Sequence, residues 1–175
     1  SAIDGKVKVG RKGTAMYRIT IHGRAAHAGL EPEKGINATV EIARIVDQLI
    51  KLANPASGTS VVPTVMKSGT TLNTVPALAT LEIDARSFKI SEMERVEREI
   101  KSLKPTHPDA KIEISGGINR PPLEESATAE LLKLCQAAGK KLGITIDSAV
   151  VGGASDGNFA GLHTRVLDGL GAVGS

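Results

Sequence analysis

The sequence predicts an α+β fold in which two helices cover one face of a four-stranded antiparallel sheet. Some segments alternate between apolar and polar residues, and others repeat apolar residues at helical spacing. Their order along the chain is β-α-β-β-α-β. Placing both helices on one sheet face is the economical way to bury both apolar stripes. We therefore expect a ferredoxin-like βαββαβ two-layer sandwich over residues 10–117.

Four strands are expected from period-two alternation or from a high content of β-branched residues. They span 14–22, 59–66, 77–88 and 111–115. Pro63 lies inside the second segment and cannot donate a backbone hydrogen bond. It therefore predicts an edge strand or a bulge there.

Two helices connect these strands. The first is expected over 37–52, before Asn54-Pro55. Its apolar stripe is built on Ile36, Val40, Ala43, Val46 with the adjacent Ile45, and Leu49 with Ile50. The second begins at Ser91, because Ser91 and Glu94 form a capping-box pattern. Its stripe is Met93, Val96, Ile100 and Leu103.

A second unit is predicted after a boundary at 116–122, which is rich in glycine and proline. It contains a helix over 126–142 and short strand candidates at 144–146, 149–151 and 164–167. Residues 118–175 are too few to build a convincing core alone, so they indicate part of a parallel α/β unit. Residues 1–9 are expected to be a linker.

Composition excludes several classes of function. Lysine and arginine number 22 against 19 acidic residues, which gives a net charge of +3. A charge this small attracts nucleic acid or an anionic membrane only weakly. Aromatic residues make up 2%, too few for platforms on which single-stranded nucleic acid stacks. The chain has no apolar run of about 18 residues and no signal-peptide pattern. We expect a cytoplasmic protein with neither nucleic acid nor membrane as partner.

Metal-ligating residues are also sparse. Cys135 is the single cysteine, and no histidine stands in H-E-x-x-H or a comparable spacing. The four histidines are His22, His27, His107 and His163. The sequence therefore predicts no metal site in this chain.

Two glycine-rich motifs suggest chemistry but lack their usual context. Gly153-Ala-Ser155-Asp-Gly157 matches the G-x-S-x-G nucleophile elbow, yet no histidine follows Asp168 to complete a triad. A serine hydrolase using Ser155 is thus a minor alternative. The run 169–174 matches G-x-G-x-x-G, but no helix opens behind it.

Three further residues are candidates for binding or catalysis. His27, flanked by alanine and glycine after a strand, could donate a hydrogen bond to an oxyanion. Asn73 lies in a turn, and Arg86 lies on the polar face of a strand where it could bind a carboxylate. Taken singly, each also fits a plain interpretation: a loop histidine, a turn-forming asparagine and an arginine paired with Asp84.

Taken together, five linked motifs resemble one family. The motifs are Gly23-Arg-Ala-Ala-His27-Ala-Gly29, Glu33-Lys-Gly35-Ile-Asn37-Ala38, Asn73-x-Val-Pro76, Asp84-x-Arg86 and Gly152-Gly153-x-Ser-Asp156. In the order and spacing of these motifs, the chain resembles the dizinc exopeptidases and amidohydrolases that include carboxypeptidase G, acetylornithine deacetylase, succinyl-diaminopimelate desuccinylase and the aminoacylases, above all the glutamate-carboxypeptidase type.

The resemblance implies a division of roles. Residues 10–117 would be a lid that mediates homodimerisation, and 118–175 a C-terminal fragment of the zinc-peptidase catalytic domain. Such enzymes use two zinc ions to activate a water that cleaves an amide bond next to a carboxylate in an N-acyl amino acid or peptide. His27 would stabilise the oxyanion in the partner's active site. Asn73, Arg86, Gly152 and Gly153 would bind substrate.

The resemblance also implies that the zinc ligands and the catalytic glutamate precede Ser1, with one further histidine ligand after Ser175. We therefore expect no zinc on this chain, and no hydrolysis by the isolated chain. The alternative is a stand-alone, non-catalytic module that dimerises through the edge of its sheet.

Overall fold

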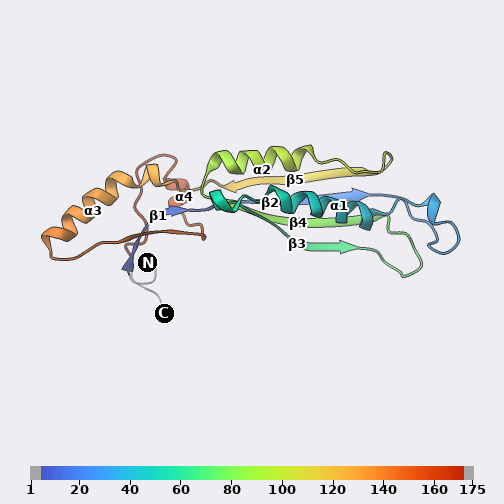
Figure 1. Cartoon of the computed structure of the whole chain (residues 1–175), viewed down its shortest axis with the longest axis horizontal. Helices are drawn as coiled ribbons and strands as arrows, with labels where there is room; N and C mark the ends of the chain where they lie inside the picture. Colours follow the sequence, from blue (N-terminus) through green and yellow to red (C-terminus); the bar gives the residue numbers. More distant parts are fainter. Residues whose placement is uncertain (1–4, 172–175) are drawn as a thin grey trace.

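A computed structural model describes residues 5–171 and contains the expected two-layer domain. Its sheet has the strand order β3-β4-β2-β5, and every neighbouring pair is antiparallel. The strands are β2 (Gly13–His22), β3 (Ser60–Ser68), β4 (Leu78–Ser87) and β5 (Lys111–Arg120). The helices α1 (Ala38–Leu49) and α2 (Ile90–Ser102) join them in the order β-α-β-β-α-β. The predicted fold class is confirmed (Figure 1).

The core of this domain lies between the sheet and the two helices. Alternate residues of β2 and β4 are buried, which is the expected result when one face of a sheet is covered. Ile19, Ile42 and Ile100 are each 0% exposed and come from β2, α1 and α2. Truncating such a side chain to alanine typically costs about 2–5 kcal/mol of stability.

The stripe of α1 that faces the sheet agrees only in part with the predicted one. Ile45 and Leu49 are buried as predicted, but Val40 is 42% exposed, and the buried Ile42 was not predicted. Helix α1 carries apolar residues on two sides, and both sets recur at helical spacing, so periodicity alone does not select between them. Packing against the neighbouring strands determines which side of α1 is buried.

The predicted capping box of α2 is wrong. The helix begins at Ile90, and no side chain of its own first turn caps it. Instead, the Glu124 carboxylate accepts a hydrogen bond from the Ile90 amide at 3.0 Å and pairs with Lys89 Nζ at 3.0 Å. A residue 34 positions away in sequence therefore satisfies the helix end, and a local motif gives no sign of this.

Both possibilities raised by Pro63 occur. Strand β3 lies at an edge of the sheet, and its register with β4 shifts between Pro63 and Val65. The expected boundary at 116–122, in contrast, begins inside β5, which continues to Arg120. Gly116 has φ +95°, and a Cβ there would lie 2.1 Å from the Met16 carbonyl oxygen. Glycine at this position lets β5 run close against β2.

The second unit pairs two segments from opposite ends of the chain. Strand β1 (Val7–Arg11) lies parallel to β6 (Ser148–Val151), and α3 (Ala129–Lys141) and the short α4 (Gly157–Ala160) accompany them. Figure 1 shows this unit beside one end of the two-layer domain. The expected strands at 144–146 and 164–167 do not form, because neither segment has a partner strand in the described residues.

Part of the expected linker over 1–9 belongs to β1. Val7 and Val9 are 3% and 7% exposed, so their apolar side chains contribute to the second unit. Residues 1–4 lie outside the described residues, as does the end of the G-x-G-x-x-G run. No described helix is long and apolar enough to cross a membrane.

Candidate functional site

His27 and Asn73 lie on two loops that are joined at one end of the sheet. The Ala28 amide donates to the Asn73 carbonyl at 2.8 Å, and the Val75 amide donates to the Ala26 carbonyl at 2.9 Å. Both the His27 and the Asn73 residues are exposed. The structure thus brings these two predicted site residues together on one protruding tip.

The imidazole of His27 is oriented by its own loop. Its Nδ1 accepts a hydrogen bond from the Gly29 amide at 3.2 Å. In the neutral ring, the proton is therefore on Nε2, the atom that could donate to an oxyanion outside the loop. The small residues Ala28 and Gly29 leave room for a second molecule to approach.

Arg86 lies near the opposite end of the sheet. It is near the end of β4, whereas the tip joins the start of that strand at Leu78. Arg86 is eight positions after Leu78, a span of about 26 Å at about 3.3 Å per residue. One chain therefore does not bring Arg86 to His27 and Asn73.

The guanidinium of Arg86 is held in a fixed direction. Its Nε and Nη2 donate to the two oxygens of the Asp84 carboxylate at 2.8 Å and 3.0 Å. Hydrogen bonding to Asp84 raises the pKa of Arg86 above its usual value. The side chain remains 38% exposed, so its other donors face outward.

Gly152 and Gly153 form an exposed turn directly after β6. No heavy atom lies within 4 Å of where a Cβ would be at either position. Arg11 Nη1 donates to the Gly153 carbonyl at 2.8 Å, and this hydrogen bond holds the turn in place. The backbone of this turn is accessible to a ligand.

Ser155 is bonded to a carboxylate and not to a histidine. Its Oγ donates to Asp168 Oδ2 at 2.6 Å and accepts from the Gly157 amide at 3.2 Å. A nucleophilic serine needs a neighbouring base such as imidazole, and no histidine is bonded to Ser155 among the described residues. The geometry is that of a structural hydroxyl in a tight loop.

Sequence reasoning missed the ion pair that holds this loop. Arg11 Nε donates to Asp168 Oδ2 at 2.6 Å, across 157 positions of sequence, and Arg11 is 7% exposed. Burial alone would raise the pKa of Asp168, but the hydrogen bonds from Ser155 and Arg11 outweigh it and lower the pKa. No motif links two residues so far apart in the chain.

Arg120 is a second residue that the sequence did not single out. Thr14 is the register partner of both Arg86 and Arg120, so the two arginines share one sheet face with β2 between them. The Arg120 guanidinium stacks 4.8 Å above the Phe159 ring and lies 3.8 Å from Asp156. Two cationic groups therefore flank the end of the sheet that adjoins the glycine turn.

Comparison with known families decides the identity of this fold. The family model described as "Peptidase dimerisation domain" matches residues 9–109. The chain belongs to the M20 peptidase dimerisation-domain family. The resemblance inferred from the five motifs is confirmed.

Relatives of the M20 domain include characterised and uncharacterised proteins. Carboxypeptidase G2 of Pseudomonas sp. (strain RS-16) is 30% identical over 99% of this chain and 43% of its own length. The uncharacterized protein YqjE of Bacillus subtilis (strain 168) is 25% identical over 91% of this chain and 43% of its own length. The chain thus spans less than half of the curated relatives it matches.

Solved structures agree on the fold. Aminopeptidase PepT from Bacillus cereus superposes with a TM-score of 0.79 at 23% identity, covering 93% of this chain and 44% of that protein. A tripeptidase from Staphylococcus aureus gives the same TM-score and coverage at 20% identity. At these identities the likeness concerns the fold alone.

The described residues of the M20 chain do not fit a zinc pair. Within 5–171, no three or more His, Cys, Asp or Glu side chains cluster as a metal would require. We therefore assign no residue of this chain to a metal and derive no step through one.

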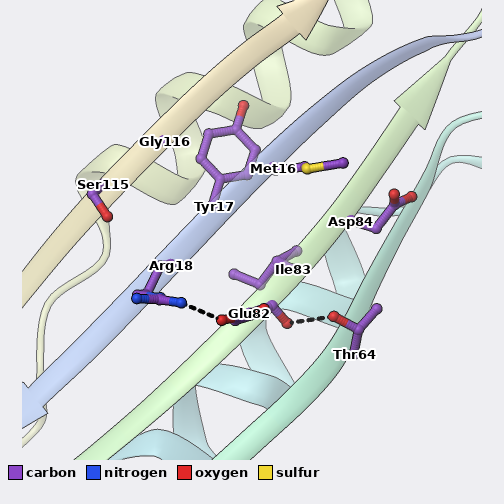
Figure 2. Close-up of a pocket in the computed structure, with 9 residues that line it drawn as sticks. All are labelled: Met16, Tyr17, Arg18, Thr64, Glu82, Ile83, Asp84, Ser115 and Gly116. Carbon is purple, nitrogen blue, oxygen red and sulfur yellow. Dashed lines mark hydrogen bonds and ion pairs between the residues drawn. The ribbon is translucent and has the colours of Figure 1, made fainter.

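The exposed face of the sheet holds a shallow cavity of about 420 Å³ (Figure 2). Arg18 and Glu82 form an ion pair across it, and Thr64 donates to the Glu82 carbonyl at 3.1 Å. None of the five predicted site residues lines this cavity. Its charged groups are paired, Arg18 with Glu82 and Asp84 with Arg86, which is typical of a solvated sheet face.

Proposed function

We propose that this chain is the dimerisation domain and an adjoining part of an M20 exopeptidase or amidohydrolase of the glutamate-carboxypeptidase type. The parent would hydrolyse an amide bond next to a carboxylate, in an N-acyl amino acid or a peptide. The observation that carries the proposal is the family match over 9–109, in which His27 and Arg86 stand at opposite ends of one sheet. The relative named carboxypeptidase G2 supports the reaction class.

In this proposal residues 10–117 act as the dimerising lid, and 118–175 as part of the catalytic domain. A zinc pair, if the parent uses one, is held by residues outside this chain. Support comes from the 43% coverage of the curated relatives. The isolated chain is then inactive, and added zinc or cobalt leaves it so.

The dimer is proposed to form through β3. As an edge strand, β3 presents backbone groups to which another strand can bind. Val62, Val65 and Met66 on it are 47%, 43% and 54% exposed, an apolar surface that a second copy would cover. Antiparallel pairing of two β3 strands gives a two-fold axis and one continuous sheet.

Such a dimer explains the separation of the predicted site residues. The tip with His27 and Asn73 would reach the partner's active site, while Arg86, Gly152 and Gly153 would serve their own. His27 Nε2 would donate to the oxyanion, and Arg86 would bind the substrate carboxylate with its outward donors. Removing one oxyanion donor costs about 10²- to 10³-fold in rate.

Mixed dimers of the parent protein test this assignment. His27→Ala and Arg86→Ala homodimers are each expected to lose about 10²-fold or more of kcat/KM. After subunit exchange, a mixed dimer has one site with both residues intact. Random exchange makes about half of all dimers mixed, so about a quarter of the parent activity should return.

The control is the same exchange between two differently tagged copies of His27→Ala, which should restore nothing. Absence of recovery in the first mixture, with exchange verified by the tags, would contradict the assignment of His27 and Arg86 to different subunits.

A stand-alone dimerisation module is the second candidate. The exposed β3 edge favours it, because pairing through an edge needs no active site. Sedimentation of the purified chain detects the dimer. Assays of N-acyl amino acids and dipeptides with added zinc or cobalt ask whether the chain alone has activity.

A further inference from the structure

The polypeptide passes twice between the two-layer domain and the second unit. The first passage is at Lys12, between β1 and β2, and the second follows β5 at Pro121. The passages are paired by their backbones, since the Arg11 amide donates to the Leu123 carbonyl at 3.0 Å and the Leu123 amide donates back at 3.1 Å. The two passages therefore lie side by side, and bonds made to them affect the orientation of one half relative to the other.

A single buried side chain binds both passages. Asn158 lies in α4 and is 0% exposed. Its Nδ2 donates to the Lys12 carbonyl at 3.1 Å and to the Pro121 carbonyl at 2.8 Å. Its Oδ1 accepts from the Ser155 amide at 2.8 Å, which connects it to the glycine turn at 152–153.

The site requires a carboxamide. Two carbonyl oxygens face Asn158 and need donors, while one amide faces it and needs an acceptor. An asparagine side chain supplies both kinds of group, and all three bonds are made. A carboxylate has no donor and would point an oxygen at two partly buried carbonyls, and an alanine would leave three polar groups without this partner.

We propose that Asn158 is a positioning residue that sets the orientation of the two-layer domain relative to the loop 152–156. Through the Lys12 and Pro121 carbonyls it fixes both passages at once, and through the Ser155 amide it fixes the loop. Under the proposed function, Asn158 would keep Arg86 and Gly153 in a fixed position relative to each other. The inference itself does not rest on that function, because its test measures orientation and needs no substrate.

The experiment measures the distance between two spin labels in the full chain. Labels are placed at Arg98→Cys in α2 and Lys133→Cys in α3, both exposed, with Cys135→Ser removing the native thiol. Pulsed electron paramagnetic resonance gives the distance distribution. Amide hydrogen exchange in β2, β4, β1 and β6 reports whether each half stays folded.

With Asn158→Asp, we expect the distance distribution to widen at least twofold, while exchange in β2 and β4 changes less than twofold. The matched control is Asn37→Asp. Asn37 caps α1 through Oδ1 alone, and aspartate caps equally well, so neither readout should move. Asn158→Ala serves as the second variant if the carboxylate unfolds β1 and β6.

Two results would overturn the proposal. In one, the distribution stays as narrow as in the unsubstituted chain. In the other, exchange in β2 and β4 accelerates together with the widening. The second result would show that Asn158 stabilises the whole chain and does not position its halves.

Discussion

His27 and Arg86 stand at opposite ends of one sheet, with about 26 Å of β4 between Leu78, near the loop tip that carries His27, and Arg86. His27 is exposed at its end, and the Arg86 side chain is partly exposed at the other. A single chain does not bring these two site candidates together. The proposed two-fold dimer would do so, because it would place the His27 tip of one copy near the Arg86 end of the other. The geometry of β3 makes the dimer the first property to test.

Adding charge to the β3 edge is expected to weaken the dimer proposed to form through it. Val65→Lys combined with Met66→Lys puts two cations on each exposed edge, and pairing of two β3 strands would bring the cations of both copies to one interface. We expect the dissociation constant to rise at least tenfold, or about 1.4 kcal/mol, in analytical ultracentrifugation.

Ser115→Lys is the matched control, because it adds a cation to β5 at the other edge of the sheet. Equal weakening by Ser115→Lys, or no weakening by the β3 variant, would place the interface elsewhere.

The Glu92 carboxylate predicts a stability that depends on pH. A hydrogen bond from Arg95 is the largest cause of its lowered pKa, about 2, and Thr59 and Ser57 also donate to it. Because the folded pKa lies below the ordinary value of 4.5, ionised Glu92 stabilises the fold above pH 4.5. This contribution is lost as the pH falls toward 2.

Glu92→Gln should therefore lower the free energy of unfolding by about 1–2 kcal/mol at pH 7, after allowance for solvent screening. The difference between the two proteins should shrink steadily between pH 4.5 and pH 2. Urea unfolding at several pH values measures it. Glu94→Gln, at an exposed position on the same helix, is the matched control and should change the free energy of unfolding at pH 7 far less.

The sequence predicted what local chemistry determines. Pro63 indicated an edge or a bulge because the missing amide is a property of that residue alone. The sequence did not predict the cap of α2, since Glu124 comes from a distant part of the chain. It also failed to choose between the two apolar sides of α1, because Val40 and Ile42 both fit helical spacing and only the sheet distinguishes them.

The candidate site was likewise predictable only where neighbouring residues in the sequence determine it. His27, Asn73 and Arg86 belong to short motifs, so a pattern could identify them, although their placement at opposite ends required the fold. Arg11 and Asp168 carry no motif, and their contact across 157 positions exists only after folding.

The Arg11–Asp168 pair is expected to stabilise the second unit cooperatively. Arg11→Met leaves a mostly buried carboxylate without its cation, and Asp168→Asn leaves a buried cation. We expect each single change to cost about 2 kcal/mol, and the double change to cost at least about 1 kcal/mol less than their sum.

A double-mutant cycle, read by hydrogen exchange of β1, β6 and the Gly157 amide, measures this coupling. The exchange of β2 and β4 serves as an internal control, because Arg11 and Asp168 have no bonds to the two-layer domain among their described contacts. Strict additivity would show that the two side chains act independently.

Gly116 is expected to be far less tolerant than Gly143, although both have positive φ, +95° and +71°. A Cβ at Gly143 meets no atom within 4 Å, so Gly143→Ala should cost only the backbone strain, about 1 kcal/mol. A Cβ at Gly116 would lie 2.1 Å from the Met16 carbonyl, so Gly116→Ala adds a clash that β2 and β5 must separate to relieve. We expect a loss of about 3 kcal/mol in thermal or urea unfolding, with faster exchange of the β2 and β5 amides. Equal losses for the two variants would mean that conformational strain alone, and not the close approach of the strands, requires glycine at position 116.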